Sequence, residues 1–327
     1  MKTSIIGYPR VGSLRELKFA SEKYFRNEIN SEKLFEIALN LRTEHWNIQR
    51  ENGIDFIPSN DFSFYDNMLD TAYLFNIIPE RYKELNLSGI DIYFAMARGY
   101  QGESGDVKAL AMKKWFNTNY HYMVPEIEDT ADIKLAGTKP FDEFIEAQSI
   151  GINTKLVITG AFTMLKLSRF TGSKNISDFI DIIIAVYSEL LSKFNSLGAE
   201  YIQFDEPYLV FDLTGDDKKL FTSLYEKILS VKGNTKVILQ TYFGDVRDCY
   251  NEICTLDFDG IGLDFIEGRK SLELVKAFGF PKDKILFAGL VNGKNIWRNS
   301  YAKTIEALTE LKKYCSDIVL NTSCSLL

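Results

Sequence analysis

The sequence has few of the residues that bind metal ions or form cross-links. It contains only two histidines and four cysteines, and no Cys-x-x-Cys pair occurs. A zinc site needs three or four Cys, His or acidic ligands that converge, whereas Cys249 and Cys254 lie five residues apart, off a common helix face. A chain of 327 residues can also form a core without disulfide bonds. We therefore expect no metal ion and no disulfide bond in this chain.

Long apolar segments and long basic segments are missing as well. No run approaches the roughly 20 apolar residues of a membrane-spanning helix, and the N-terminus is too weakly apolar for a signal peptide. The formal net charge is -7 without a basic stripe, which argues against nucleic acid as a partner. The composition is globular, with 46% hydrophobic and 25% charged residues. We expect a cytoplasmic protein that binds neither membranes nor nucleic acids.

The N-terminal stretch predicts a short strand, a tight loop and the start of a helix. Ile5-Ile6 is an apolar pair typical of a buried strand, and the glycines and proline of Gly7–Gly12 predict a loop after it. Ser13 and Glu16 have the spacing of a capping box, in which the two side chains satisfy backbone N–H groups of the first helical turn. The sequence therefore predicts a helix that begins at Ser13.

Three cations surround this predicted helix start. Arg10 precedes it, and Arg15 and Lys18 share one helix face because they lie three residues apart. A helix N-terminus carries partial positive charge, so each cation placed there costs roughly 0.3–1 kcal/mol. One interpretation is an anion-binding site built from the loop, the helix N-terminus and the cations. The other is that Lys18 pairs with Glu22 and Arg15 points into water.

Apolar strands alternate with amphipathic helices from residue 155 onward. This alternation predicts parallel βαβ units, and the nearly continuous apolar strands are typical of strands buried on both faces. With earlier candidates at residues 5–6, 54–58 and 113–126 there are nine candidate strands for the eight places of a (β/α)8 barrel, so one is short or lies outside it. We predict an α/β fold, a single (β/α)8 TIM-type barrel with helical additions near the N-terminus. The later predicted strands are Lys155–Thr159, Tyr201–Phe204, Lys236–Gln240, Gly260–Asp264, Ile285–Ala288 and Asp317–Leu320.

Polar residues follow four of the predicted strands, at the positions that carry functional sites in barrels. Asp205 and Glu206 could form a general acid/base pair or anchor a ligand; alternatively, Asp205 caps the next segment and holds the rim. Apart from these, Lys114 precedes Trp115, an arrangement that suits an anionic ring-bearing ligand or a solvated turn. The four strand exits are Asn60-Asp61, Asp205-Glu206, Gln240–Asp245 and Asn321–Cys324. We expect Gly7–Lys18, Asp205-Glu206 and Gln240–Asp245 at one rim.

Long motifs show which family this sequence resembles. They are Gly7-Tyr-Pro-Arg-Val-Gly12, Arg15-Glu-Leu-Lys18, Lys114-Trp-Phe-Asn-Thr-Asn-Tyr-His-Tyr-Met-Val-Pro-Glu126, Phe204-Asp-Glu-Pro207, Gln240-Thr-Tyr-Phe-Gly-Asp245 and Asn321-Thr-Ser-Cys-Ser-Leu-Leu327. Over its whole length the chain resembles the N-terminal half of cobalamin-independent methionine synthase. The resemblance implies transfer of a methyl group from a 5-methyltetrahydrofolate polyglutamate to the thiol of homocysteine. It also implies two face-to-face barrels, with the catalytic zinc and the homocysteine pocket in the C-terminal one, and no cobalamin.

The resemblance also assigns site residues. The family's folate contacts match Arg15, Glu16, Leu17, Lys18 and Lys114, which favours the anion-site interpretation, with the cations meeting the polyglutamate tail. Where the other barrel has His-x-Cys, this chain reads Thr241-Tyr242-Phe243. Cys324 resembles a leftover of the last zinc cysteine, and Asp205 resembles a position that serves homocysteine in the other barrel. We therefore expect no catalytic residue and no metal ligand in this chain.

Three functions follow from these observations. The leading one takes residues 1–327 as the folate-binding N-terminal barrel domain of a zinc methyltransferase, inactive alone because the zinc barrel is absent. The second is a free-standing module that holds folate polyglutamate without catalysis. The third is a complete enzyme of the related uroporphyrinogen decarboxylase-like barrels. Asn321–Leu327 follows an apolar strand without a closing helix, which suggests a cut inside a longer polypeptide or a natural short form.

Overall fold

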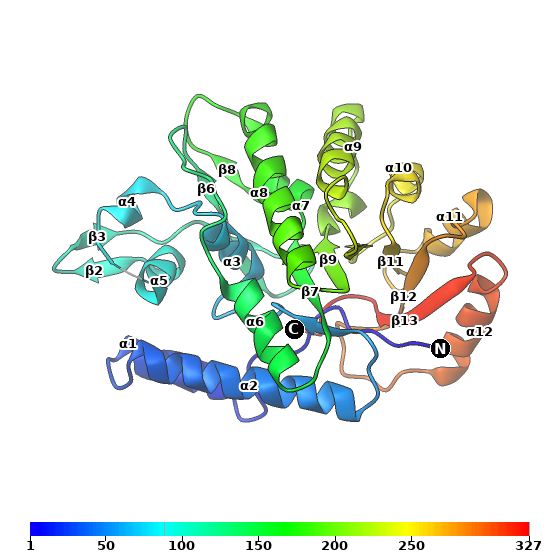
Figure 1. Cartoon of the computed structure of the whole chain (residues 1–327), viewed down its shortest axis with the longest axis horizontal. Helices are drawn as coiled ribbons and strands as arrows, with labels where there is room; N and C mark the ends of the chain where they lie inside the picture. Colours follow the sequence, from blue (N-terminus) through cyan, green and yellow to red (C-terminus); the bar gives the residue numbers. More distant parts are fainter. Residues whose placement is uncertain (88, 327) are drawn as a thin grey trace.

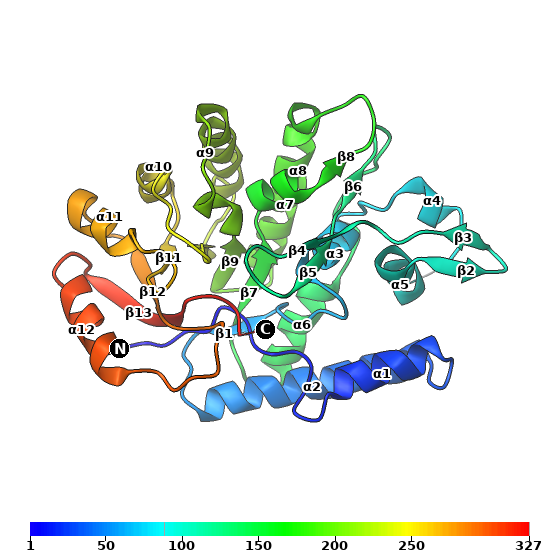
Figure 2. The ribbon, with the colours of Figure 1, turned by 180° about the vertical axis from the view of Figure 1, so that it is seen from behind.

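The centre of the molecule is a curled parallel sheet of seven strands (Figure 1, Figure 2). The computed structural model describes residues 1–87 and 89–326. The strand order is β1-β7-β9-β10-β11-β12-β13 and every neighbouring pair is parallel. The carboxyl ends of all seven strands therefore meet at one edge. The strands are β1 (Ile57–Ser59), β7 (Thr154–Thr159), β9 (Tyr201–Asp205), β10 (Lys236–Gln240), β11 (Gly260–Asp264), β12 (Ile285–Val291) and β13 (Asp317–Thr322).

Thr3 and Ser4 lie between the two outer strands of this sheet. Thr3 forms an isolated parallel bridge with Leu320 of β13, and Ser4 forms one with Phe56, next to β1. The Ser4 N–H donates to the Leu320 carbonyl at 2.8 Å, and the Phe56 N–H donates to the Thr3 carbonyl at 3.0 Å. The sequence predicts this strand at residues 5–6, so the pairing lies about two residues earlier than predicted.

Helices follow the strands and cover the outer face of the sheet (Figure 1). In α8 the Asn175 and Asp178 side chains form a capping box, and Phe179, Ile183 and Tyr187 are among its buried residues. None of the helices within the described residues is long and apolar enough to cross a membrane. The covering helices are α2 (Ser31–Glu51), α6 (Lys139–Ser149), α7 (Ala161–Leu167), α8 (Ile176–Ser196), α9 (Gly215–Leu229), α10 (Tyr250–Thr255), α11 (Ser271–Phe278) and α12 (Tyr301–Leu311).

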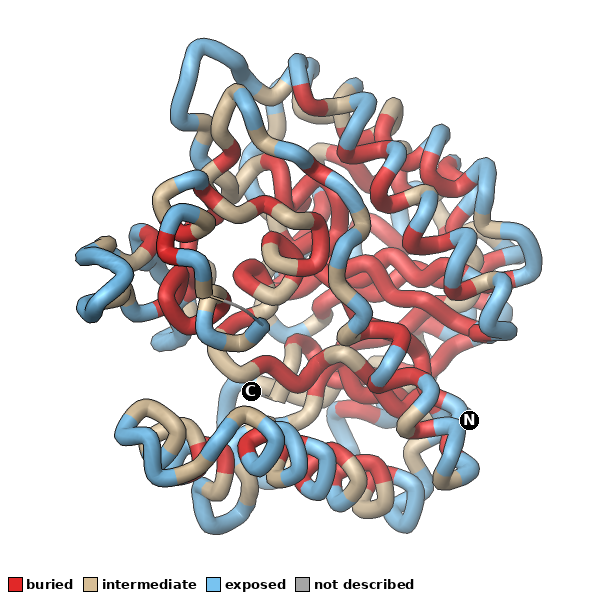
Figure 3. Tube along the Cα trace, turned by 60° about the vertical axis from the view of Figure 1, so that its left-hand side comes forward, coloured by how far each residue is buried: buried red, intermediate tan, exposed pale blue. Residues whose placement is uncertain are grey.

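Both faces of the sheet are buried, as the continuous apolar strands predict (Figure 3). In β10, Val237 and Leu239 belong to the large core under the helices. Ile238, between them, belongs to a separate cluster with Phe56 and Phe287. Because successive side chains of a strand point to opposite faces, this second cluster fills the concave side of the curled sheet.

Smaller elements lie before β7 and form the predicted N-terminal additions. Beside α1 and α2, a lobe holds α3 to α5 and two hairpins, and its apolar cluster includes Leu34, Phe94 and Met123. The ring of Phe94 packs edge-on against Phe25 of α1, with 4.8 Å between the ring centroids. These elements are α1 (Glu16–Phe25), α3 (Asn67–Leu74), α4 (Glu80–Lys83), α5 (Ile90–Arg98), β2 (Tyr100–Gly102), β3 (Gly105–Val107), β4 (Met112–Lys114) and β5 (His121–Met123). A short pair, β6 (Glu126–Ile127) with β8 (Arg169–Phe170), and a 3-10 turn, Pro207–Val210, complete the fold.

The predicted capping box at Ser13 is wrong. Helix α1 begins at Glu16, and its N-cap residue is Arg15, with φ 64° and no side-chain cap. The Glu16 carboxylate accepts a hydrogen bond from the Leu14 N–H at 3.0 Å instead. The N-cap position is therefore Arg15, two residues after the predicted N-cap Ser13, and the chain enters the helix at Arg15.

The surplus ninth strand is the segment 113–126. It does not join the central sheet: β4 and β5 pair antiparallel with each other, with Lys114 opposite His121. Lys114 thus lies in a strand of a hairpin, and the turn follows it, whereas the sequence places a basic turn before the strand.

Candidate functional site

A cavity of about 270 Å³ opens where the carboxyl ends of the strands meet. We call it the rim cavity. Gly7, Asp61, Asp205, Tyr242 and Cys324 are among the residues that line it, each on a segment that follows or ends a strand. The sequence predicts Gly7–Lys18, Asp205-Glu206 and Gln240–Asp245 at one rim. The prediction is confirmed for Gly7, Asp205 and Tyr242, whereas Arg15, Lys18 and Glu206 do not line the cavity.

Asp205 forms the polar floor of the rim cavity. One carboxylate oxygen accepts a hydrogen bond from the Gln203 amide at 2.7 Å, and the other accepts one from the Tyr242 hydroxyl at 3.1 Å. The ammonium of Lys155, only 2% exposed, donates to the other end of the Gln203 side chain. Sequence reasoning did not single out Lys155, although a lysine at the start of an otherwise apolar strand is the signal that marks it.

Burial shifts the protonation equilibria of these groups toward their neutral forms. It raises the pKa of Asp205 above its usual range, with Gln203 and Lys155 opposing the shift, and it lowers the pKa of Lys155. Burial also raises the pKa of Asp61 to about 6, opposed by a hydrogen bond from the Tyr8 N–H at 2.7 Å. The rim cavity can therefore hold or release protons near neutral pH.

Glu206, although adjacent to Asp205, is oriented away from the rim cavity and is fully buried. Its carboxylate accepts hydrogen bonds from the Phe162 N–H at 2.8 Å and the Thr163 N–H at 2.7 Å, at the start of α7. The hydroxyls of Thr163 and Tyr225 add two more, each at 2.5 Å. The two carboxylates therefore do not form an acid/base pair: Glu206 holds α7 in place, and Asp205 faces the rim cavity.

The Arg15–Lys18 motif lies on the surface beside the rim. Arg15 and Lys18 are exposed, whereas Leu17 is buried among Ala38 and Leu41 of α2. The Lys18 ammonium lies 3.8 Å from a Glu22 carboxylate oxygen, with the two side chains 52% and 44% exposed. Such an exposed pair contributes about 0–1 kcal/mol. The structure therefore contains the Lys18–Glu22 pair of the alternative interpretation, with Arg15 exposed to solvent.

Lys114 is exposed on β4, and the next residue, Trp115, lines the rim cavity. Arg15, Lys18 and Lys114 do not line that cavity. Lys114 belongs to the β4–β5 hairpin, whereas Lys18 lies on α1 and Arg15 is the N-cap residue of α1. The predicted folate residues therefore occupy two surface positions, one on α1 and one on the hairpin.

The rim cavity does not suit a zinc ion. The described part of the chain contains no group of three or more His, Cys, Asp or Glu residues that could hold a metal. Burial raises the pKa of the Cys324 thiol to about 12, which disfavours the thiolate that zinc binds. The Tyr242 hydroxyl is already bound to Asp205.

A curled parallel sheet with a polar cavity at the carboxyl edge defines a class of α/β domains whose binding sites lie on the rim loops. The chain belongs to the family described as "Cobalamin-independent synthase, N-terminal domain", which matches residues 2–316.

Two relatives named 5-methyltetrahydropteroyltriglutamate–homocysteine methyltransferase match over all 327 residues. The protein from Streptococcus thermophilus is 58% identical and the one from Campylobacter jejuni subsp. doylei is 55% identical. In both cases the chain spans 43% of the relative's length.

Solved structures support the fold. A putative vitamin-B12-independent methionine synthase from Listeria monocytogenes aligns over 99% of this chain and 90% of its own, with a TM-score of 0.66 and 17% identity. A B12-independent methionine synthase from Shewanella sp. W3-18-1, in complex with selenomethionine, aligns over the same shares, with a TM-score of 0.69 and 13% identity.

Proposed function

We propose that residues 1–327 are the N-terminal domain of a methyltransferase. The enzyme moves a methyl group from a 5-methyltetrahydropteroyl-polyglutamate to homocysteine and produces methionine, and this domain helps to bind the folate. The observation that carries the proposal is the 58% identity, over the whole chain, to a relative named for these two substrates. The chain spans 43% of that relative, which leaves room for a second, catalytic domain with a homocysteine pocket and zinc.

We also propose that the domain is a closed (β/α)8 barrel. The bridges of Thr3 to β13 and of Ser4 to the residue before β1 support this reading, because they make residues 3–4 an eighth parallel strand between the outer two. The rim cavity then lies at the mouth of the barrel. The enzyme works without cobalamin and, as a biosynthetic protein, in the cytoplasm.

The folate tail is the ligand that the exposed cations suit best. Arg15, Lys18 and Lys114 are exposed at two surface positions, and a glutamyl tail is a flexible polyanion whose carboxylates suit such cations. Charge-assisted hydrogen bonds to carboxylates are the contacts that Arg and Lys make most strongly. Glu16 and Leu17 support the site by holding the loop and anchoring α1, rather than by charge.

Calorimetric titration with mono- and triglutamate folates, at low and high salt, tests this assignment. The titrations use both the chain alone and the chain joined to the rest of its polypeptide. Lys18→Ala and Lys114→Ala should each weaken triglutamate binding several-fold, less so at high salt, because exposed ion pairs contribute about 0–1 kcal/mol and are screened. Monoglutamate binding should hardly change. Lys227→Ala is the matched control, since Lys227 is 57% exposed and also pairs with a carboxylate, Asp181.

Equal losses for both ligands, independent of salt, would place these residues at the pteridine ring. Methyl transfer should require the longer polypeptide. A chain that binds folate tightly but never supports catalysis in any longer form would favour the second candidate, a free-standing folate-polyglutamate binding module.

A further inference from the structure

A second and larger cavity, of about 680 Å³, lies on the side of the domain between α2, α3, α5 and α6. We call it the lateral cleft. It shares no lining residue with the rim cavity. Its volume falls in the range of roughly 300–1,000 Å³ that small-molecule sites occupy.

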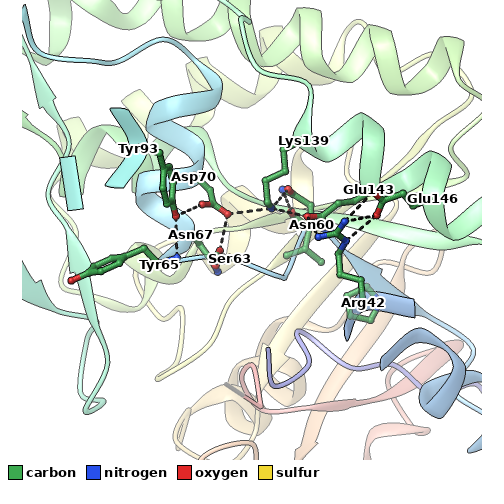
Figure 4. Close-up of polar contacts among 12 residues, drawn as sticks. Arg42, Asn60, Ser63, Tyr65, Asn67, Asp70, Tyr93, Lys139, Glu143 and Glu146 are labelled. Carbon is green, nitrogen blue, oxygen red and sulfur yellow. Dashed lines mark hydrogen bonds and ion pairs between the residues drawn. The ribbon is translucent and has the colours of Figure 1, made fainter. Parts of the chain in front are cut away.

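The floor of the lateral cleft is an ion-pair network in which Lys139 is fully neutralised (Figure 4). The Lys139 ammonium donates to the Asn60 side chain at 2.7 Å and lies 3.2 Å from Asp70 and 3.3 Å from Glu143. Asp70 is held in turn by the Tyr93 hydroxyl at 2.6 Å. The lysine therefore has no positive charge to offer to an anionic ligand.

Arg42, the other cation of the floor, is neutralised in the same way (Figure 4). Its guanidinium forms a bidentate pair with the Glu146 carboxylate: Nε donates to Oε2 and Nη2 donates to Oε1, each at 2.9 Å. It also lies 3.8 Å from Glu143. Arg42 is buried and Lys139 is half-buried, and carboxylates fix both cations, so the polar floor is preorganised.

Carboxylates outnumber cations among the described residues that line the lateral cleft. Three of the carboxylates, Glu32, Glu36 and Asp142, are exposed. The excess remains even when Lys33, which pairs with Glu36 at 2.7 Å, is counted with the cations. The carboxylates are Glu32, Glu36, Asp70, Asp142, Glu143 and Glu146, and the cations are Arg42 and Lys139. The electrostatic potential of the cleft therefore favours a positively charged ligand.

The walls of the lateral cleft are apolar. Phe35 and Leu39 lie four residues apart on α2, hence on one face, and remain 46% and 38% exposed. Tyr73 of α3 and Ile90 of α5 contribute further apolar surface to the lining. A ligand that fills this space needs cationic groups for the carboxylates and hydrocarbon for the walls.

We propose that the lateral cleft binds an aliphatic polyamine. Such a molecule alternates ammonium groups with methylene chains. Its ammonium groups pair with Glu32 and Asp142, the lining carboxylates that form no ion pair among the described residues. Its methylenes pack against Phe35 and Leu39. The site does not depend on the folate assignment, because a folate polyglutamate is an anion and the cleft repels it. The domain thus carries two binding surfaces that prefer ligands of opposite charge. The cations of α1 and β4 favour an anion, and the acidic lateral cleft favours a cation.

Titration calorimetry of the chain with spermidine at low salt tests the proposal. We expect one spermidine per chain. Leu39→Lys should weaken binding at least tenfold, because it adds a cation and removes wall surface. Ile182→Lys is the matched control: Ile182 of α8 is also 38% exposed, and it lies outside the cleft. Asp142→Asn, which preserves shape, should weaken binding several-fold, and circular dichroism checks that each variant is folded.

Three results would overturn the polyamine site. The first is that spermidine does not bind. The second is equal weakening of spermidine binding by Leu39→Lys and Ile182→Lys, and the third is displacement of spermidine by Mg²⁺ at an equal concentration of charge. The second and third results would show that spermidine is attracted only diffusely by the net charge. Folate triglutamate should not compete with spermidine, and Lys18→Ala should leave spermidine binding unchanged. Failure of this proposal is therefore distinguishable from failure of the folate assignment.

Discussion

Asp205 and Glu206 show how far a pair of residues can be interpreted from sequence. Their position at the end of an apolar strand marks them as rim candidates, and the structure places both at that end. Their roles differ because the backbone turns between them, and the partners of Glu206 come from α7 and α9, many residues away. Those partners are set by tertiary packing, which the spacing of residues does not encode.

Removal of the Glu206 carboxylate should destabilise the domain. Glu206→Ala leaves the N–H groups of Phe162 and Thr163 and the Tyr225 hydroxyl without their acceptor, and each unsatisfied buried group costs about 1–3 kcal/mol. We expect a loss of at least about 3 kcal/mol in the free energy of unfolding, measured by urea denaturation. Glu200→Ala is the control, because Glu200 is exposed and forms a surface pair with Lys236. Similar losses in both variants would mean that Glu206 does not hold α7.

At the scale of elements, burial pattern decides which predictions succeed. The strands Lys236–Gln240 and Gly260–Asp264 have the predicted bounds, since a strand buried on both faces must be apolar throughout. Segment 90–105 gives no clear prediction because it mixes strand formers with helix formers before a Gly-rich loop, and its residues 90–98 fold as α5. Five consecutive residues, Tyr93–Ala97, are buried there, so packing against α1 and α3 outweighs the intrinsic preference.

The loop that leads into α1 provides a test at this scale. Gly12 has φ +83°, and a Cβ there would lie 2.1 Å from the Glu16 carboxylate and 2.9 Å from Leu41. Gly53 has φ +74°, and a Cβ added there would have no other atom within 4 Å, so Gly53→Ala is a control for backbone strain alone. Gly53→Ala should cost about 1–2 kcal/mol of stability. Gly12→Ala should cost more and should also weaken folate triglutamate binding, because Glu16 and the neighbouring cations must shift.

Urea denaturation and triglutamate titration measure these two effects. Equal stability losses in Gly12→Ala and Gly53→Ala, with unchanged ligand binding, would show that the loop tolerates the added methyl group and does not position Arg15.

At the scale of the whole molecule, the cavities are the features that sequence does not predict. The lateral cleft combines residues from α2, α3, α5 and α6, which alternate with other elements along the chain. Lys139 was not a candidate because its partners Asn60, Asp70 and Glu143 meet only after packing. Arg15, Lys18 and Lys114 could be named from sequence because they lie in contiguous motifs, and their assignment to folate remains a prediction.

The pH dependence of stability is a property of the whole molecule, to which several buried carboxyl groups contribute. Burial raises the pKa of Asp61 and Asp264 to about 6, and that of Asp66 and Glu206 to about 7. In the unfolded chain these groups titrate near pH 4. Between those values the folded state keeps protons that the unfolded state has released, so their contribution is fully present below about pH 4 and is lost as the pH rises to about 7.

One group opposes this trend within the window: burial lowers the pKa of His45, so its contribution to stability rises with pH up to about 6.5. Asp129 and Lys155 act outside the window. Hydrogen bonds lower the pKa of the exposed Asp129, so its stabilising contribution is present above about pH 4 and is lost only at lower pH. Burial lowers the pKa of Lys155, so its contribution to stability increases at higher pH and opposes the loss from the buried carboxyls.

The free energy of unfolding should therefore be larger near pH 5 than near pH 7. Glu206→Gln, which cannot ionise, should reduce that difference by at least about 1 kcal/mol, because one pKa unit corresponds to about 1.4 kcal/mol. Urea denaturation at pH 5 and pH 7 measures the difference in the free energy of unfolding, and Glu200→Gln, at an exposed position, is the control. A free energy of unfolding that rises from pH 5 to pH 7 would show that these carboxyls are ionised without penalty in the folded state.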